Sequence, residues 1–240
     1  RICATTASFA LLVASLGANA DPSGEAFARI ERLISAARTL NYDATFVYSR
    51  DGQMHEMRII HRYANGVERE RLVTLSGSAR EVLRDDTLVT CIIADRQAVV
   101  VGKSRPQALY GSAVLTGRGY RDYYTLGLEG EDRVAGRTAE IVAIKPRDEF
   151  RFGYRLWVDQ TSGLLLRSEL LGEDNQVLER IVYLSLSTPE EIPDKLLEPE
   201  ISGSGFSRYT STPSKQAPSP SSEWGIGWLP PGFTMRERES

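Results

Sequence analysis

One apolar hairpin in the second half of the chain constrains the fold more than any other feature. Residues 150–171 read FRFGYRLWVDQTSGLLLRSELL, two extended apolar runs joined by a turn that ends in glycine, where a positive φ is tolerated. Two-residue alternation in the first run predicts one face made by Phe152, Tyr154, Leu156 and Val158, and a second face made by Arg151, Arg155, Trp157 and Asp159. The second run carries leucine on both faces. Such a hairpin must be covered on both sides, by protein or by an apolar ligand.

The residues before the hairpin predict one helix followed by a meander. Over residues 23–40, apolar side chains recur at helical spacing opposite charged ones, which predicts one amphipathic helix. From Tyr42 the period becomes two, and Asp51-Gly52 and Asn65-Gly66 have the composition of two-residue hairpin turns. These two turns predict three consecutive antiparallel strands.

Further extended runs continue to residue 187. They lie near residues 79–84, 87–94, 97–102, 138–145, 150–158, 164–171 and 176–187. Residues 103–130 do not alternate cleanly and are rich in glycine, tyrosine and leucine, so we expect short helices or a loop that covers one mouth of the sheet. About ten strands and one leading helix predict an α+β fold, in which a curved antiparallel sheet is partly covered by helix.

The two ends of the chain predict export and a second unit. Residues 1–20 contain a short apolar run followed by Ala18-Asn19-Ala20, which has the form of a signal-peptidase site, so the mature chain is expected to begin at Asp21. A buried amino-terminal helix is the alternative. Residues 21–201 form the expected large domain, and residues 202–222, rich in serine, glycine and proline, the expected linker. Residues 223–240 then predict the start of a second, truncated domain.

Charge argues against a general nucleic-acid binder. Without Arg1 the 29 basic and 32 acidic residues become 28 and 32, a net charge of −4. Lysine accounts for only four of the 29 basic residues, and several arginines are spaced along the extended runs, at Arg58, Arg62, Arg69, Arg71, Arg80 and Arg84. An arginine-lined face able to grip phosphate or carboxylate is one interpretation. Solvated strand faces are the favoured one, because acidic residues are interspersed.

The sequence contains no catalytic signature. His55 and His61 are six residues apart on a predicted strand, but no HExxH motif or Cys/His cluster accompanies them, so we expect no metal site. No G-x-S-x-G elbow or nucleotide-binding glycine loop is present. Cys91 lies among apolar residues, which favours a packed thiol over a reactive one. We therefore expect a protein that is not an enzyme and has no cofactor.

Several short motifs together carry a family resemblance. They are GYRLWVD, LLLRSELL and VLER in and after the hairpin, and YDATFVY (42–48), RIIHR (58–62), ERLVTL (70–75), REVLR (80–84), VAGR (134–137) and WLPPGF (228–233). In this order they resemble the MucB/RseB family of periplasmic sigma-E regulators. The resemblance implies a half-barrel similar to that of the lipoprotein carrier LolA, with helices plugging its concave side.

The resemblance also implies partners. In that family the protein binds the periplasmic region of an anti-sigma factor of the RseA/MucA type and shields it from the site-one protease. A mislocalised lipoprotein or lipopolysaccharide is the proposed signal. The alternative is a periplasmic lipid or lipoprotein carrier of the LolA type, which needs no second domain. Both readings place the mature protein in the periplasm, without a membrane span.

An apolar ligand would need a cleft that is lined by apolar side chains. We expect its lining to include Phe46, Tyr48, Phe152, Tyr154, Leu156 and Leu166, because a curved sheet of this size can enclose more volume than its side chains fill. Ordinary core packing is the alternative for each of these residues.

Overall fold

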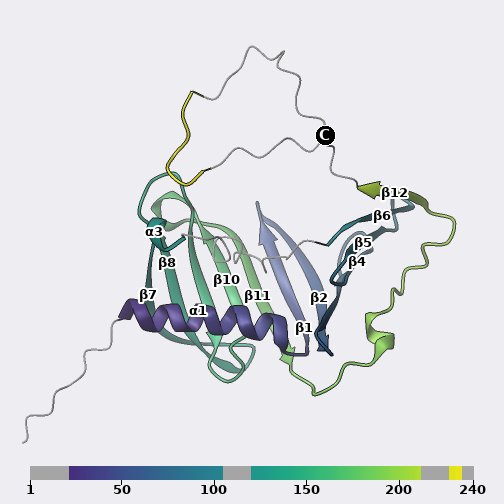
Figure 1. Ribbon diagram of the computed structural model, residues 1–240, viewed down its shortest axis with the longest axis horizontal. Helices are drawn as coiled ribbons and strands as arrows, with labels where there is room; N and C mark the ends of the chain where they lie inside the picture. The colour runs from purple at the N-terminus through teal and green to yellow at the C-terminus, as the bar shows by residue number, and fades with distance from the viewer. Residues whose placement is uncertain (1–21, 105–119, 212–226, 234–240) are drawn as a thin grey trace, which may run out of the picture.

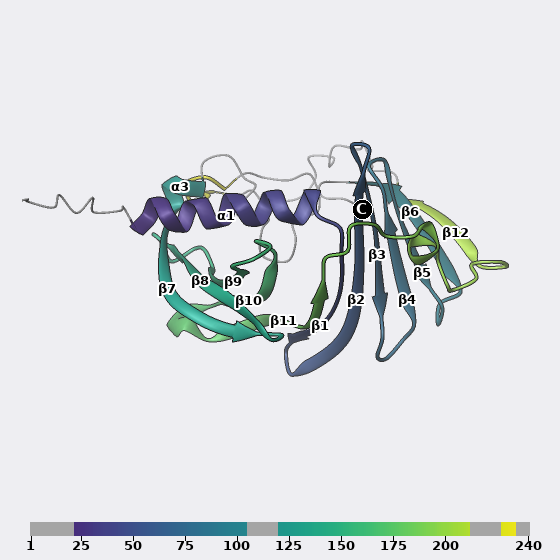
Figure 2. The ribbon, with the colours of Figure 1, turned by 90° about the horizontal axis from the view of Figure 1, so that it is seen from below.

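Over the described residues, twelve strands form one curved sheet, and one long helix lies along its concave side (Figure 1, Figure 2). The structure, a computed structural model, describes residues 22–104, 120–211 and 227–233. In chain order the elements are α1 (Pro22–Thr39), β1 (Tyr42–Arg50), β2 (Gln53–Ala64), β3 (Val67–Thr74), β4 (Arg80–Arg84), β5 (Leu88–Ile93), β6 (Ala98–Lys103), α3 (Tyr120–Tyr123), β7 (Tyr124–Val134), β8 (Arg137–Pro146), β9 (Gly153–Asp159), β10 (Leu165–Leu171), η1 (Glu173–Asn175), β11 (Val177–Ser187), η2 (Asp194–Leu197) and β12 (Ser207–Ser211).

The strands follow the order β12-β6-β5-β4-β3-β2-β1-β11-β10-β9-β8-β7 across the sheet. Neighbouring strands are antiparallel except β12 and β6, which run parallel. The predicted α+β class and curved antiparallel sheet are therefore confirmed, and the sheet has the half-barrel form that the family resemblance implies (Figure 2). Within the described ranges, no helix combines the length and the apolar character needed to cross a membrane.

Tight turns set the register of the hairpins. Asp51 and Gly52 both have positive φ, at 51° and 75°, as do Asn65 and Gly66, at 54° and 83°. Positive φ at both central residues is the signature of the type I′ turn, whose twist matches that of the flanking strands. The meander predicted from these two dipeptides is confirmed by the pairing of β1 with β2 and of β2 with β3.

Two strands lie where the sequence predicted none. β7 occupies part of residues 103–130, where we expected short helices or a loop, and in the described part of that range α3 alone is helical. A register shift between Leu128 and Glu131, with Gly130 at a φ of 107°, interrupts the alternation that would have revealed this strand. β12 lies inside the predicted linker, and no apolar pattern marks it because its residues 207–210 are exposed. Residues 1–20, 105–119 and 212–222 lie outside the described residues.

Helix α1 fills the concave side of one half of the sheet. Its residues Ala26, Ile30 and Leu33 are at most 4% exposed. They share a core cluster with residues of β7, β8, β9 and β10, namely Tyr124, Leu126, Val142, Ile144, Leu156, Val158 and Leu165. Nearer its carboxyl end, the helix contributes Ala36 and Ala37 to a second cluster that contains residues of β1, β2 and β3. The helix predicted over residues 23–40 is therefore confirmed, and its apolar face is used for packing.

The segment that follows β11 covers the opposite face of β2 and its neighbours. Ile192 and Leu197 are at most 4% exposed and pack against Ile60 of β2. Leu197 belongs to the short helix η2. The two faces of this part of the sheet are thus covered by different segments, with α1 on the concave side and residues 188–201 on the other.

A buried ion pair lies beneath the second of these segments. Arg71 of β3 and Glu81 of β4 are each 1% exposed, and Arg71 Nε donates to Glu81 Oε2 at 3.1 Å. The Glu81 carboxylate also accepts hydrogen bonds from the backbone N–H groups of Glu200, at 3.1 Å, and Ile201, at 3.0 Å. The interpretation of the strand arginines as solvated is therefore wrong for Arg71, because the segment after β11 covers its face of the sheet.

One carboxylate holds the turn of the β9–β10 hairpin. Asp159 is 1% exposed, and its Oδ2 accepts hydrogen bonds from the Ser162 backbone N–H at 2.8 Å, the Ser162 hydroxyl at 2.6 Å and Arg137 Nη2 at 2.9 Å. Burial alone raises the pKa of Asp159, but the hydrogen bonds from Arg137 and Ser162 outweigh it and lower this pKa below the ordinary value of 3.8. Gly163 closes the turn with a φ of 80°, as the sequence predicted.

We expect Glu81→Ala to destabilise the protein by about 3–5 kcal/mol, because it leaves the Arg71 guanidinium buried with its main counter-charge removed. Urea unfolding followed by circular dichroism measures the change. Glu198→Ala is the matched control, since Glu198 is exposed and lies on the same covering segment. A loss below about 1 kcal/mol for Glu81→Ala would show that the ion pair is not buried as described.

We expect Asp159→Asn to cost about 1.5–3 kcal/mol at neutral pH, because a charged hydrogen-bond acceptor is lost. The folded-state pKa of Asp159 is depressed, so its contribution is fully present above the ordinary value of 3.8 and is lost as the pH falls through the folded value. The stability difference between the unaltered protein and Asp159→Asn should therefore shrink below pH 3.8. Unfolding curves at several pH values test this, and a difference that does not change with pH would contradict it.

Candidate functional site

An apolar row crosses the concave face from the core to the edge of the sheet. Cross-strand pairing aligns Ala44, Ile59, Leu72, Val82, Cys91, Val100 and Tyr209, one from each of β1, β2, β3, β4, β5, β6 and β12. Residues in register on adjacent strands share one face of the sheet. Ala44, Ile59 and Leu72 belong to the cluster that receives α1, which identifies this face as the concave one.

Burial decreases along this apolar row. Ala44 is 1% exposed and Leu72 is 8% exposed, whereas Val82, Cys91 and Val100 are half-buried and Tyr209 is 57% exposed. The inner end of the row is therefore core, and its outer end presents apolar side chains that packing does not fully cover. A half-buried apolar strip of this kind can bind an acyl chain or an apolar side chain.

A polar row runs beside the apolar one. Tyr42, His61, Glu70 and Arg84 are aligned on β1 to β4 in the same way. The Tyr42 and His61 rings stack at a centroid distance of 4.7 Å, and His61 Nδ1 donates to the Leu40 carbonyl at 2.9 Å. Burial lowers the pKa of His61 and raises that of Tyr42 well above 10. Both rings are therefore neutral at physiological pH.

Two donors in the polar row lack a partner. Arg84 Nη2 donates to Glu70 Oε2 at 2.8 Å, but within the described residues neither Arg84 Nε nor the Tyr42 hydroxyl has a hydrogen-bond partner. Buried polar groups are normally satisfied, by protein, by water or by a ligand. Both atoms are enclosed by protein, so they are not open to a ligand that lies on the partly exposed outer end of the apolar row.

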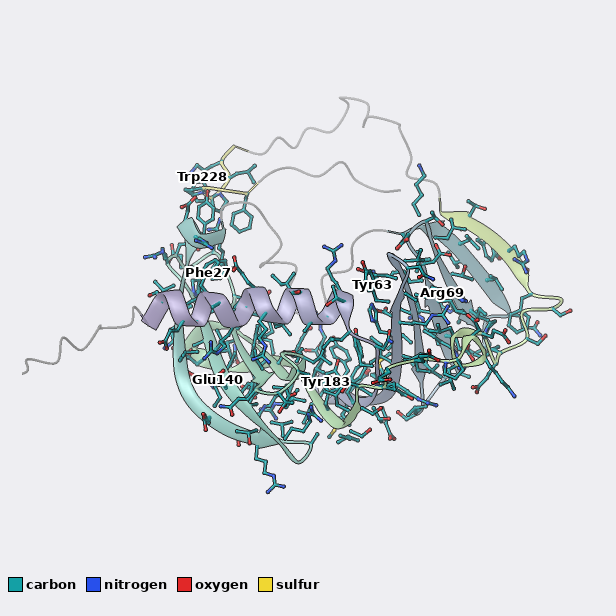
Figure 3. All side chains as sticks on the ribbon, turned by 60° about the horizontal axis from the view of Figure 1, so that its bottom comes forward. Phe27, Tyr63, Arg69, Glu140, Tyr183 and Trp228 are labelled. Atoms are coloured by element: carbon teal, nitrogen blue, oxygen red, sulfur yellow. The ribbon has the colours of Figure 1, made fainter. Side chains whose placement is uncertain are left out.

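The carboxyl end of α1 borders a pocket of about 360 Å³. Ile34 and Arg38 of the helix line one side, and Tyr63 and Glu68, the cross-strand pair that follows His61 and Glu70, line the other. Arg38 Nε donates to Glu68 Oε1 at 3.1 Å across it. Figure 3 shows Tyr63 beside the end of the helix.

A larger cavity, of about 660 Å³, lies at the turn between β8 and β9. Phe150, Phe152 and Tyr154 supply its aromatic lining, and the η1 turn supplies its acidic rim. Burial raises the pKa of Tyr154 to about 12. The cavity shares no lining residue with the apolar row, and the β8–β9 turn that borders it lies at the same end of the sheet as α3 (Figure 1).

The structure does not bring the six predicted cleft residues together. Phe46 is buried in the cluster around the carboxyl end of α1, where Tyr48 packs against it. Leu156 is buried in the cluster beneath the first turns of α1, together with Tyr154. Leu166 is buried in a third cluster with Trp157, and Phe152 is 53% exposed. Core packing, the alternative that the sequence left open, describes the positions of Phe46, Leu156 and Leu166.

The placement of Leu166 and Phe152 has local causes. A register shift between Leu165 and Arg167 turns Leu166 to the face that carries Trp157, opposite the face of Leu156. β9 begins at Gly153, so Phe152 lies outside the strand whose alternation was expected to orient it. Sequence reasoning also missed Val100 and Tyr209, because the register that aligns β6 with its neighbours cannot be read from one strand and β12 lies in a segment with the composition of a linker.

His61 is buried and Cys91 is half-buried, so both are packing residues, whereas His55 is exposed. His55 and His61 pair with Tyr48 and Tyr42, so both face the same side of the sheet, but in the described ranges no group of metal-ligating residues is assembled. Cys91 is a free, half-buried thiol, and Arg80 Nε lies 3.2 Å from its sulfur. Sequence neighbours gave no sign of this arginine, since cross-strand pairing brings it there.

The family model and the curated relatives identify the same family. The MucB/RseB N-terminal domain family matches residues 25–201. The sigma factor AlgU regulatory protein MucB of Pseudomonas aeruginosa is 36% identical over 239 residues, which covers 96% of this chain and 71% of that protein. The sigma-E factor regulatory protein RseB of Haemophilus influenzae is 30% identical over 241 residues, covering 96% of this chain and 72% of that protein.

Solved structures agree with the sequence comparison. The complex of Pseudomonas aeruginosa MucA and MucB matches with a TM-score of 0.67 at 32% identity, covering 88% of this chain and 68% of that one. An uncharacterized conserved protein from Thermus thermophilus shares the fold, with a TM-score of 0.54 at 16% identity, covering 78% of this chain and 99% of that one. Since the family match extends over most of the chain and is joined by a relative at 36% identity, this chain belongs to the MucB/RseB family.

Proposed function

We propose that this protein is a periplasmic regulator that binds the periplasmic region of an anti-sigma factor of the RseA/MucA type and shields it from proteolysis. The observation that carries the proposal is the family match over residues 25–201. A similar solved structure, with a TM-score of 0.65 and 33% identity, is MucB in complex with MucA(peri). The curated relatives are named as regulatory proteins, which favours a binding role over catalysis.

We place this function in the periplasm. The apolar run before Ala20 is the basis, and removal of residues 1–20 would release a chain that begins at Asp21. Residues 202–222, apart from β12, would then act as the connection to a further domain that begins near residue 223.

We further propose that an apolar ligand, such as the acyl chain of a lipoprotein or of lipopolysaccharide, controls partner binding. The outer part of the apolar row supports this, because Val82, Val100 and Tyr209 remain partly exposed on one face. Each methylene that the ligand buries there contributes about 0.8 kcal/mol. A ligand that prefers the partner-free state weakens the partner complex by its difference in affinity, and no covalent bond needs to break.

A carrier of the LolA type is the second candidate, and the same apolar row favours it. A carrier binds its lipid as cargo, so its ligand affinity does not depend on the anti-sigma segment. A regulator must show reciprocal coupling, in which partner and ligand weaken each other by the same factor. Measuring ligand affinity with and without the partner therefore separates the two.

We expect the protein to protect the anti-sigma segment from its protease. A fluorescently labelled peptide that covers the periplasmic region of the anti-sigma factor from the same genome is incubated with the site-one protease. At a protein concentration ten times the dissociation constant, cleavage should slow by about tenfold, because only the free peptide is cut. A scrambled peptide is the control. Unchanged cleavage at saturating protein would contradict shielding, and absence of binding would contradict the proposed function itself.

We expect Val100→Glu to weaken the binding of a fluorescent fatty acid by at least about tenfold, which corresponds to 1.4 kcal/mol, because it places a charge on the apolar row. Val101→Glu is the matched control, since it makes the same change on the same strand but on the opposite face. The melting temperatures of both variants verify folding. Equal losses of affinity in the two variants would show that the row is not the ligand site.

If the unaltered protein does not bind the fatty acid at high micromolar concentration, both the sensor and the carrier proposals fail. The anti-sigma interaction would remain testable by the protease assay, so the two parts of the proposal are separable.

A further inference from the structure

The segment 227–233, with the sequence GWLPPGF, lies against the half-barrel at the β8–β9 turn. It belongs to residues 223–240, which the sequence predicts to be the start of a truncated domain. Trp228 and Phe233 are 65% and 41% exposed, but both contact the large domain. Figure 3 shows Trp228 at the end of the molecule that carries α3.

Arg151 is the residue on which these contacts converge. Its guanidinium carbon lies 4.1 Å from the centre of the Tyr123 ring and 4.5 Å from the centre of the Phe233 ring. The guanidinium also donates to the Pro231 carbonyl and to the Asp148 carboxylate. Although Arg151 lies in a turn, its side chain is only 9% exposed. A planar guanidinium between two rings combines cation–π attraction with hydrogen bonding in its own plane, a geometry that lysine does not reproduce.

Two further contacts fix how residues 227–233 lie on the large domain. The Phe150 and Trp228 rings meet edge to face, with centroids 5.3 Å apart and planes at 65°. Gly232 has a φ of 79°, and a Cβ atom there would lie 2.4 Å from the Tyr123 ring, so only glycine fits this approach without movement. The Phe233 backbone N–H donates to the Pro230 carbonyl at 3.1 Å, which closes a turn around the two prolines.

The receiving surface is itself rigidly positioned. The Arg147 backbone N–H donates to the Tyr123 carbonyl at 2.9 Å, which joins α3 to the end of β8. Asp148 accepts a hydrogen bond from the Phe150 backbone N–H at 3.0 Å while it pairs with Arg151. Tyr123, Phe150 and Arg151 therefore form one preorganised surface, which we call the turn platform.

We infer that the turn platform is a docking surface for residues 227–233 of this chain, and that Arg151 is the residue on which docking depends. The inference is independent of the proposed function, because it rests on contacts within the chain. β12 anchors the preceding described segment at the β6 edge, whereas the turn platform lies beside β7 and β8, near the other edge. Docking thus fixes the position of Phe233 on the large domain.

The chemistry of the surface indicates a reversible contact. Its aromatic members keep much of their surface in solvent, with Phe150 at 44% and Trp228 at 65% exposed. The contact is held by one cation between two rings, one edge-to-face pair and the hydrogen bond from Arg151 to the Pro231 carbonyl. Contacts of this kind are individually modest, so removing Arg151 should shift the balance from docked to undocked.

Limited proteolysis of the full chain tests the inference. Chymotrypsin cuts after Trp228 only when the segment is undocked, and when docking is fast the rate of cutting follows the undocked population. We expect Arg151→Ala to increase this rate roughly tenfold, Arg151→Lys to increase it by a smaller factor, and Gly232→Ala to act like Arg151→Ala. Arg147→Ala is the matched control, because the side chain of Arg147 is exposed and only its backbone joins the platform.

A double-substitution cycle identifies the contact itself. If Arg151 acts through Phe233, the variant Arg151→Ala/Phe233→Ala should be cut no faster than Arg151→Ala alone. The melting temperature of the large domain should be unchanged in Phe233→Ala, since that side chain lies outside the core clusters. Equal cutting rates in the unaltered protein and Arg151→Ala, or additive effects in the cycle, would overturn the inference. A rate that falls as protein concentration rises would also overturn it, since the segment would then dock on a second copy.

Discussion

The length of α1 decides which part of the concave face is core and which part is surface. The helix has 18 residues and is therefore about 27 Å long. The twelve strands of the described residues, spaced by about 4.8 Å, span about 53 Å across the sheet. One helix can cover only about half of such a sheet, and it covers the half built from β7 to β10 together with the start of the meander (Figure 2). The apolar row beyond it is half-buried on β4, β5 and β6 and exposed at Tyr209 on the β12 edge.

The opposite face of the meander is covered by a different segment and carries a buried pair of charges. There the segment after β11 closes over the sheet through Ile192 and Leu197, and the Arg71–Glu81 pair beneath it is satisfied by backbone N–H groups of the same segment. Moving this segment away would remove the backbone hydrogen bonds to the buried Glu81 carboxylate, which is costly for a charge held out of water. Apolar side chains are therefore left partly exposed on the concave side, while charges fix the covering segment on the other.

The sequence predicted the elements whose conformation is set by neighbouring residues. Asp51-Gly52 and Asn65-Gly66 specify their turns through backbone conformation alone, and the helix over residues 23–40 follows from its apolar spacing. The sequence did not reveal β7, β12 or the face of Leu166, because a bulge, a register shift or an exposed edge position cancels the alternation. The six residues predicted to line a cleft lie in separate clusters or at the surface. Cross-strand register placed Val82 and Val100 on the apolar row, and no single strand carries that information.

Burial of an acyl chain on the apolar row can supply the free energy that the proposed sensing step requires. Moving a two-state equilibrium from 1:99 to 99:1 requires a difference in ligand affinity of about 5.5 kcal/mol. At about 0.8 kcal/mol for each buried methylene, some seven methylenes that are buried in one state and exposed in the other supply it. An acyl chain of ordinary length has more than that number, and the row offers partly exposed apolar side chains on β4, β5, β6 and β12 to receive it. Under the proposed function, anti-sigma release would need neither catalysis nor a charged switch, only two states of the protein that cover this row to different extents.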